Sequence, residues 1–207
     1  QKHDIALDAQ QVNEFVFHNI DSAPASVVVD ANRHWIAIFK DEKTTDEWIK
    51  QLDFTDNAVA KREAVLALGN TAKTDTTGLV KPKIIAALCQ SLKLNDYWKL
   101  KYGTILQLQQ LLVPFGNSLP VVLGDTVVEA LQWVVRNEKA WTKMAAIQLL
   151  GESRDEKFTD TYLNNLYDES DRVTYAAAIA LGKSRSTKAF EALLALRKKP
   201  SWKNQSL

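Results

Sequence analysis

The sequence is poor in the residues on which several kinds of chemistry depend. A single cysteine, Cys89, excludes an internal disulfide framework. Cys89 lies in a row of apolar residues spaced like one face of a helix, so we expect a buried and unreactive thiol. The three histidines, His3, His18 and His34, show no spacing that would bring them to one metal ion. We therefore expect ordinary surface positions for them and no metal-binding residue.

An excess of charge of one sign is also missing. The 26 Lys and Arg residues nearly balance the 25 Asp and Glu residues, which leaves a net charge of +1. The densest basic run, Arg197-Lys198-Lys199, is explained by the end of a helix, whose partial negative charge attracts cations. Nucleic acid is therefore not expected as a partner, because no long-range attraction to phosphates is built into the chain.

Long apolar runs are absent as well. No stretch approaches the roughly 18 consecutive apolar residues that a membrane-spanning helix needs, so we expect no membrane partner. We also expect no signal peptide. The lone cysteine fits a cytoplasmic protein, and it is also compatible with a periplasmic one.

The sequence contains none of the short motifs that carry catalysis. It has no His-Glu-x-x-His, no Gly-rich phosphate loop, no nucleophile elbow and no Cys-x-x-Cys pair. We expect no catalytic or cofactor-binding residue, no cofactor and no enzyme activity within these 207 residues. Asp56, Asp96, Glu138 and Asp171 precede or open apolar-periodic segments, which predicts N-caps or first-turn acids and not acid–base catalysts.

One motif recurs four times, and it determines the predicted fold. Its copies have small residues in the middle, and three of them end in Leu-Gly; they span 59–69, 98–108, 141–151 and 173–182. Small side chains let a neighbouring helix approach closely, and the terminal glycine is typical of a helix stop. Trp98, Trp141 and Tyr175 lie near the starts of these copies, which favours packing between stacked helix pairs, although such a ring could also line a concave groove.

Helical periodicity runs through residues 43–207 and predicts about nine helices in antiparallel pairs. Thr44 to Glu47 fits a capping box at the start of the first helix. The interval from Gly151 to Gly182 is 31 residues, whereas the earlier units are nearer to about forty. Irregular spacing of this size indicates a HEAT-like α-α superhelix and not a tetratricopeptide array, whose repeat is fixed.

Residues 1–42 follow a different pattern, which predicts a few antiparallel β-strands. Three segments are rich in β-branched or aromatic residues: 14–18, 25–29 and 35–39. Residues 30–33 form a plausible hairpin turn between the last two segments. So few strands do not form a stable sheet alone, so we expect them to pack on the helices or on a missing neighbour.

The order of these segments resembles one region of a known family. The segments that carry the resemblance are Phe15-Val16-Phe17, Ala23 to Asp30, Trp35 to Phe39, Trp48 to Leu52 and Arg62-Glu63-Ala64. Together they are similar to the large zinc metallopeptidases of the aminopeptidase N-like (gluzincin) family, where a small β-sandwich domain leads into a C-terminal helical domain. Lys199 to Trp202 looks like the opening of a further repeat of that domain. Ala31 departs from the pattern, since the family often has proline after the aspartate.

The resemblance implies that residues 1–42 are the last strands of a small β-sandwich and that residues 43–207 are a HEAT-like helical-repeat domain, truncated at its C-terminal end. The only methionine is Met144, so we expect a piece of a longer or processed protein. Its implied function is that of the non-catalytic C-terminal region of a zinc metalloaminopeptidase. Such a region serves as scaffold or lid and limits the access of peptides to the active site.

Several further expectations depend on the same resemblance. The parent enzyme would remove N-terminal residues from peptides, and its zinc would lie in a catalytic domain outside this chain. That N-terminal catalytic domain is the implied partner, with peptide substrate at the concave face of the helices. The alternative reading is a free-standing HEAT-like scaffold that binds another protein. This alternative explains the helices but leaves the strands and the broken last repeat unexplained.

Overall fold

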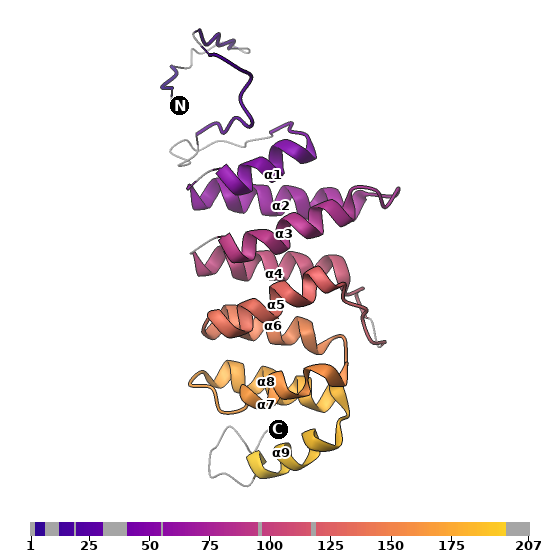
Figure 1. The fold of residues 1–207 in the computed structure, drawn as a ribbon. Coiled ribbons are helices and arrows are strands. Elements are labelled where there is room, and N and C mark those ends of the chain that lie inside the picture. The colour runs from indigo at the N-terminus through magenta and orange to yellow at the C-terminus, as the bar shows by residue number, and fades with distance from the viewer. Residues whose placement is uncertain are drawn as a thin grey trace.

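The computed structural model describes residues 3–6, 13–18, 20–30, 41–54, 56–94, 97–116 and 119–197. Within them the chain is mostly α-helical, as predicted, with nine α-helices and one short 3-10 helix. The elements are α1 Thr45–Phe54, α2 Ala58–Thr74, α3 Lys81–Leu94, α4 Trp98–Leu112, α5 Asp125–Asn137, α6 Ala140–Gly151, η1 Glu156–Phe158, α7 Thr159–Asn164, α8 Asp171–Ser184 and α9 Thr187–Arg197. Figure 1 shows them stacked from α1 at one end to α9 at the other, with α8 next to α6 and α7 beyond it.

The stack is built from helix pairs in two layers. Consecutive helices run in opposite directions and pack on one another, as α1 does on α2, α3 on α4, α5 on α6 and α7 on α8 (Figure 1). The even helices, α2, α4, α6 and α8, also pack on each other in order and form one layer. In the other layer α1 packs on α3 and α3 on α5, while α9 packs on α7 and α8. All even helices therefore begin at the same edge of the stack.

Local hydrogen bonds at the helix starts explain where two of the helices begin. The capping box predicted for the first helix is confirmed, because the Thr44 backbone N–H donates to Glu47 Oε2 at 2.7 Å and the Glu47 N–H donates to Thr44 Oγ1 at 3.3 Å. Asn57 caps α2, where its Oδ1 accepts from the N–H groups of Val59 and Ala60. Asp56, predicted for this role, precedes the cap by one residue and is exposed.

The connection between α2 and α3 is organised by one carboxylate. Asp75 Oδ1 accepts hydrogen bonds from the Thr77 hydroxyl at 2.6 Å and from the backbone N–H groups of Thr77 and Gly78. Its Oδ2 accepts from the N–H groups of Val80 and Lys81 at the start of α3. These bonds, above all the one from the Thr77 hydroxyl and the one from the Lys81 N–H, lower the pKa of Asp75 to about 2.

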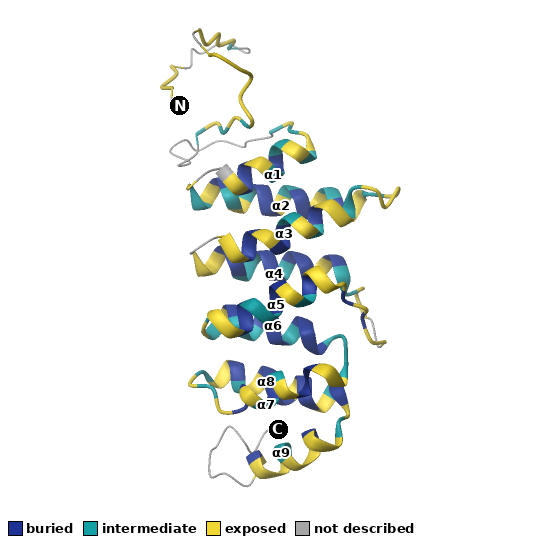
Figure 2. Ribbon diagram, viewed as in Figure 1, coloured by how far each residue is buried: buried dark blue, intermediate teal, exposed yellow. Residues whose placement is uncertain are grey.

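The core extends along the whole stack instead of collecting at one centre, as Figure 2 shows. Large aliphatic residues such as Leu68, Ile105 and Ile147 are fully buried between the layers. The small residues in the middle of the recurring motif are also buried, which confirms the predicted close approach of the helices; they include Ala60, Ala64, Ala145, Ala146, Ala176, Ala177 and Ala180. This is the packing on which a helical-repeat array depends.

The prediction that the motif's glycines end their helices was wrong for two of three. Gly69 lies inside α2 and Gly182 inside α8, and only Gly151 is the last residue of its helix. At Gly69 the physical reason is packing, because a Cβ there would overlap the side-chain amide oxygen of Gln107 on α4. The end of α8 is instead set by Arg185, which adopts the left-handed conformation with φ of 54°.

The first part of the chain differs most from its prediction. Residues 14–18 and 25–29 are described and contain no strand, while residues 31–40, including the predicted strand at 35–39 and most of the turn, lie outside the described residues. No described segment lies beside 14–18 or 25–29 in a ladder, and a strand needs such a partner to satisfy its backbone groups. The segment does meet the helices at Gln51, which accepts from the Ser26 hydroxyl at 3.5 Å.

Candidate functional site

The exposed side of the even helices carries a regular set of large side chains. They recur three or four residues apart along each helix and stand at equivalent positions on successive helices. We call this surface the even-helix face and define it by Val59, Arg62 and Leu66 of α2, Trp98, Tyr102 and Leu106 of α4, Trp141, Met144 and Gln148 of α6, and Arg172, Tyr175 and Ile179 of α8. Because α2, α4, α6 and α8 pack in order, these residues form one strip across the stack.

Aromatic rings and cations lie against one another near the edge where the even helices begin. Tyr102 of α4 and Trp141 of α6 meet edge to face, with ring centroids 6.0 Å apart. Arg172 of α8 lies on the same indole, its Cζ 3.8 Å from the ring centroid. Lys99 Nζ lies 5.6 Å from the centroid of the Trp98 ring. One ring, Trp141, thus joins side chains from three consecutive even helices.

The aromatic residues singled out from the sequence are only partly used for packing. Trp141 does contact Tyr102 of the neighbouring unit, as predicted. However, 43% of Trp98, 38% of Trp141 and 51% of Tyr175 remain exposed. Exposed rings this large on three consecutive even helices make a surface suited to binding, since aromatic residues contribute strongly to interface energetics.

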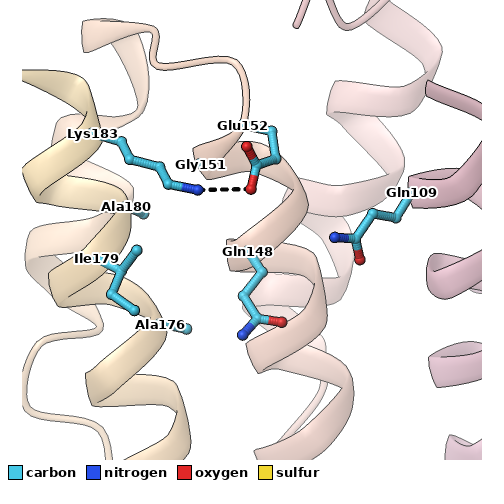
Figure 3. A pocket seen from close by; sticks show the side chains of 8 residues that line it. All are labelled: Gln109, Gln148, Gly151, Glu152, Ala176, Ile179, Ala180 and Lys183. Atoms are coloured by element: carbon cyan, nitrogen blue, oxygen red, sulfur yellow. Dashed lines mark hydrogen bonds and ion pairs between the residues drawn. The ribbon is translucent and has the colours of Figure 1, made fainter. Parts of the chain in front are cut away.

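A cleft of about 260 Å³ lies near the other end of the same helices. Figure 3 shows its lining, which comes from α4, α6 with its C-cap, and α8: Gln109, Gln148, Gly151, Glu152, Ala176, Ile179, Ala180 and Lys183. Lys183 Nζ donates to Glu152 Oε1 at 2.7 Å and so bridges α8 to the end of α6. The polar lining consists of two amides and this ion pair, which can hydrogen-bond a ligand but include no nucleophile with a neighbouring base.

Charge is distributed unevenly between the two layers, although the total is close to zero. The even helices carry eight basic residues, namely Lys61, Arg62, Lys73, Lys99, Lys101, Lys143, Arg172 and Lys183, against the two acids Glu63 and Asp171. The odd helices α1, α3, α5, α7 and α9 carry seven Lys and Arg and seven Asp and Glu. The positive potential is therefore concentrated on the even layer.

Two of the even-layer lysines pair with carboxylates from the connections between helices. Lys143 Nζ donates to Asp168 Oδ2 at 2.7 Å. Partial burial alone would raise the pKa of Asp168, but the hydrogen bonds from Lys143 and from the Ser170 N–H bring it below its ordinary value. Lys101 is buried and donates to Glu138 Oε1. Both bonds join neighbouring helix pairs, so these lysines serve the architecture.

The predicted roles of the helix-start acids are confirmed in one case. Asp171 is the first residue of α8, in the first turn, as predicted. Glu138 was predicted as a cap or first-turn acid, and this was wrong: Lys139 is the N-cap residue of α6, while Glu138 turns toward Lys101. Its carboxylate satisfies a buried ammonium, a need that outweighs a local cap. Asp96 lies outside the described residues.

The residues considered for other chemistry have simple environments. Cys89 is buried, as predicted, and burial raises the pKa of its thiol to about 12, so it stays protonated. His3 and His18 are exposed, and His34 lies outside the described residues, as do Lys198 and Lys199 of the basic run. Among the residues that the structure describes, no three His, Cys, Asp or Glu side chains are grouped so as to hold a metal ion.

None of the described helices combines the length and the apolar character that crossing a membrane requires.

Comparison with known protein families matches residues 127–206 to HEAT repeats. The matched part runs from α5 through α9, and α1 to α4 repeat the same two-layer arrangement. No curated protein matches the chain.

Four of the residues that shape the surface were not identified from the sequence: Tyr102, Gln109, Gln148 and Arg172. A usable signal was present, because aligning the four motif copies places large or polar residues at the same non-core positions. Recognising them required knowing which side of each helix faces its neighbour.

Proposed function

We propose that this chain is a helical-repeat scaffold that binds a protein partner along the even-helix face. The observation that carries the proposal is the recurrence of partly exposed rings, Trp98, Trp141 and Tyr175, on three consecutive even helices. Single exposed apolar residues are ordinary, but a contiguous row across stacked units is typical of a protein-binding surface. The match to HEAT repeats supports the same reading, because stacked helix pairs present extended surfaces.

Site-specific photo-cross-linking tests this proposal. Benzoylphenylalanine at position 175, on the even-helix face, should trap a protein from extracts of the source cells. The same reagent at position 90, an exposed site on α3, should not trap it. Replacing Trp141 with Ala in the first variant should abolish the adduct. Equal cross-linking from both positions, or adducts that survive Trp141→Ala, would contradict the proposal.

A second candidate is the reading in which the chain belongs to a zinc metalloaminopeptidase. It is favoured by the exposed apolar residues Phe15, Val16, Phe17, Val27 and Val29, whose pattern suits pairing with strands of a β-sandwich. In this proposal the helices limit peptide access and the zinc is held by a catalytic domain outside these 207 residues.

This second candidate has a direct test. The protein encoded by the complete gene should contain one zinc per chain and hydrolyse aminoacyl anilides, whereas the 207-residue chain alone should do neither. A complete gene product without zinc and without peptidase activity would leave the scaffold as the remaining proposal.

A further inference from the structure

We infer that the partner segment bound by the even-helix face is acidic, with apolar or aromatic side chains between its carboxylates. This inference rests on the proposed scaffold function and specifies its partner. The charges of the even helices and the arrangement of rings and cations on this face support it.

Positive charge remains on the even helices after their internal ion pairs are formed. Lys101, Lys143 and Lys183 are neutralised by Glu138, Asp168 and Glu152. Four further cations of the even helices form no ion pair with a carboxylate of the described residues: Arg62, Lys73, Lys99 and Arg172. Glu63 and Asp171 are the only acids of the same helices, so the even layer keeps an excess of positive charge, to which the even-helix face contributes Arg62 and Arg172. Opposite charge on the partner is the complement.

One cation of the face, Arg172, is held against an aromatic ring. The Arg172 guanidinium lies on the Trp141 ring, which holds it in place, and it makes no hydrogen bond to the side chains or backbone of the described residues. A guanidinium fixed on a ring still offers its N–H groups for two parallel bonds to a carboxylate. Tyr175 and Ile179, one and two turns further along α8, remain exposed for contact with apolar side chains.

The strip carries cations on its two outer helices, Arg62 on α2 and Arg172 on α8, and the aromatic rings of α4 and α6 lie between them. This order favours a partner that has apolar residues between its acidic ones. A single-stranded nucleic acid would also be attracted by cations and rings. The even-helix face itself has only two such cations, however, Arg62 and Arg172, which is few for binding a phosphate backbone. Strong nucleic-acid binding depends on many phosphate contacts, so these observations favour the acidic protein segment.

Fluorescence polarisation with the whole chain tests the inference. The probe is a labelled peptide in which Asp or Glu alternates with Phe or Leu, and its two relatives carry Gln or Lys in place of the acids. We expect the acidic peptide to bind at least about tenfold more tightly than the Gln peptide, and to weaken as salt rises from about 0.05 M to 0.5 M.

Two variants and a matched control locate the binding. Arg172→Glu should weaken the acidic peptide by about tenfold or more and should improve binding of the Lys peptide. Trp141→Ala should weaken binding by roughly thirtyfold, as expected for a central ring. Arg136→Glu makes the same charge change at an exposed site on α5 and should leave affinity unchanged. Circular dichroism confirms that each variant remains helical, and the gain by the Lys peptide requires a folded Arg172→Glu variant.

Several outcomes would overturn the inference. They are tighter binding of the Gln or Lys peptide by the wild type, equal losses from Arg136→Glu and Arg172→Glu, absence of binding up to about 1 mM acidic peptide, or displacement of the peptide by a lower concentration of single-stranded DNA. The cross-linking result separates this from the scaffold proposal. A trapped partner whose bound segment is basic or neutral leaves the scaffold standing and removes the acidic specificity.

Discussion

Gly151 at the end of α6 lies against Ala180 of α8 so closely that a methyl group on residue 151 would stand 2.9 Å from the Cβ and 3.3 Å from the Cα of Ala180. The two helices approach here because neither residue has a side chain beyond Cβ. Both residues also line the cleft, together with Gln148 and Lys183, so the small residues shape the surface as well as the core.

Gly151→Ala should destabilise the protein by about 1–3 kcal/mol, because the added methyl group must move a backbone and not merely a flexible side chain. Gly182→Ala is the matched control, since Gly182 lies inside α8 with nothing within 4 Å of the position of a Cβ. The control should stabilise by about 0.5–1 kcal/mol, the usual gain of Ala over Gly in a helix. Urea unfolding measures both, and a stabilising Gly151→Ala would refute the close contact.

Ala177→Leu should also destabilise by about 1–3 kcal/mol. Ala177 is fully buried in α8, and extra methyl groups in a packed interface force neighbouring side chains out of their preferred rotamers. Ala86→Leu, at an exposed position of α3, should change the free energy of unfolding by less than about 0.5 kcal/mol. Equal thermal midpoints for the two variants would show that the small-residue row is not close packed.

Glu138→Gln should be among the most destabilising polar substitutions. The Lys101 side chain is 5% exposed and would lose the carboxylate that neutralises it, a change that costs up to about 3–5 kcal/mol in buried pairs. The double variant Lys101→Met with Glu138→Gln should recover most of this loss. Asp160→Asn removes an exposed pair with Lys188 and should cost no more than about 1 kcal/mol. Equal effects of Glu138→Gln and Asp160→Asn on urea unfolding would contradict the buried role.

Asp75 should make stability depend on pH in a defined direction. Its pKa is lowered to about 2 in the folded chain, against about 3.9 in an unfolded one. The contribution is therefore fully present above about pH 4 and is lost as the pH falls toward 2. Asp75→Asn should lower the thermal midpoint at pH 6, and the gap to wild type should narrow between pH 4 and pH 2. A gap that stays constant over this range would exclude the carboxylate as its source.

The helices could be predicted from the sequence because interactions between residues close in the chain determine them. Apolar periodicity places the helices, and the bonds between Thr44 and Glu47 lie within one turn. The prediction that the glycines of the Leu-Gly pairs end their helices was wrong for a different reason. At Gly69 the requirement comes from Gln107, which lies on another helix, and no local pattern reveals such a partner.

Only part of the candidate site could be predicted from the sequence. Trp98, Trp141 and Tyr175 stand out as residue types, but their exposure depends on the packing of α4, α6 and α8. The basic character of the even layer was hidden because the whole-chain charge is +1. It appears only when each helix is assigned to a layer. The strands expected before α1 were predicted from residue types alone. Such β-propensity does not produce a ladder unless a neighbouring strand is present.

Every helix pair packs mainly on the pairs before and after it. Local opening at one end of the stack therefore does not act directly on the other end. A ligand lying across α4, α6 and α8 would hold three successive units together. Binding would couple local openings of neighbouring helix pairs that occur independently in the unbound chain. Occupancy of the even-helix face would therefore stiffen the stack.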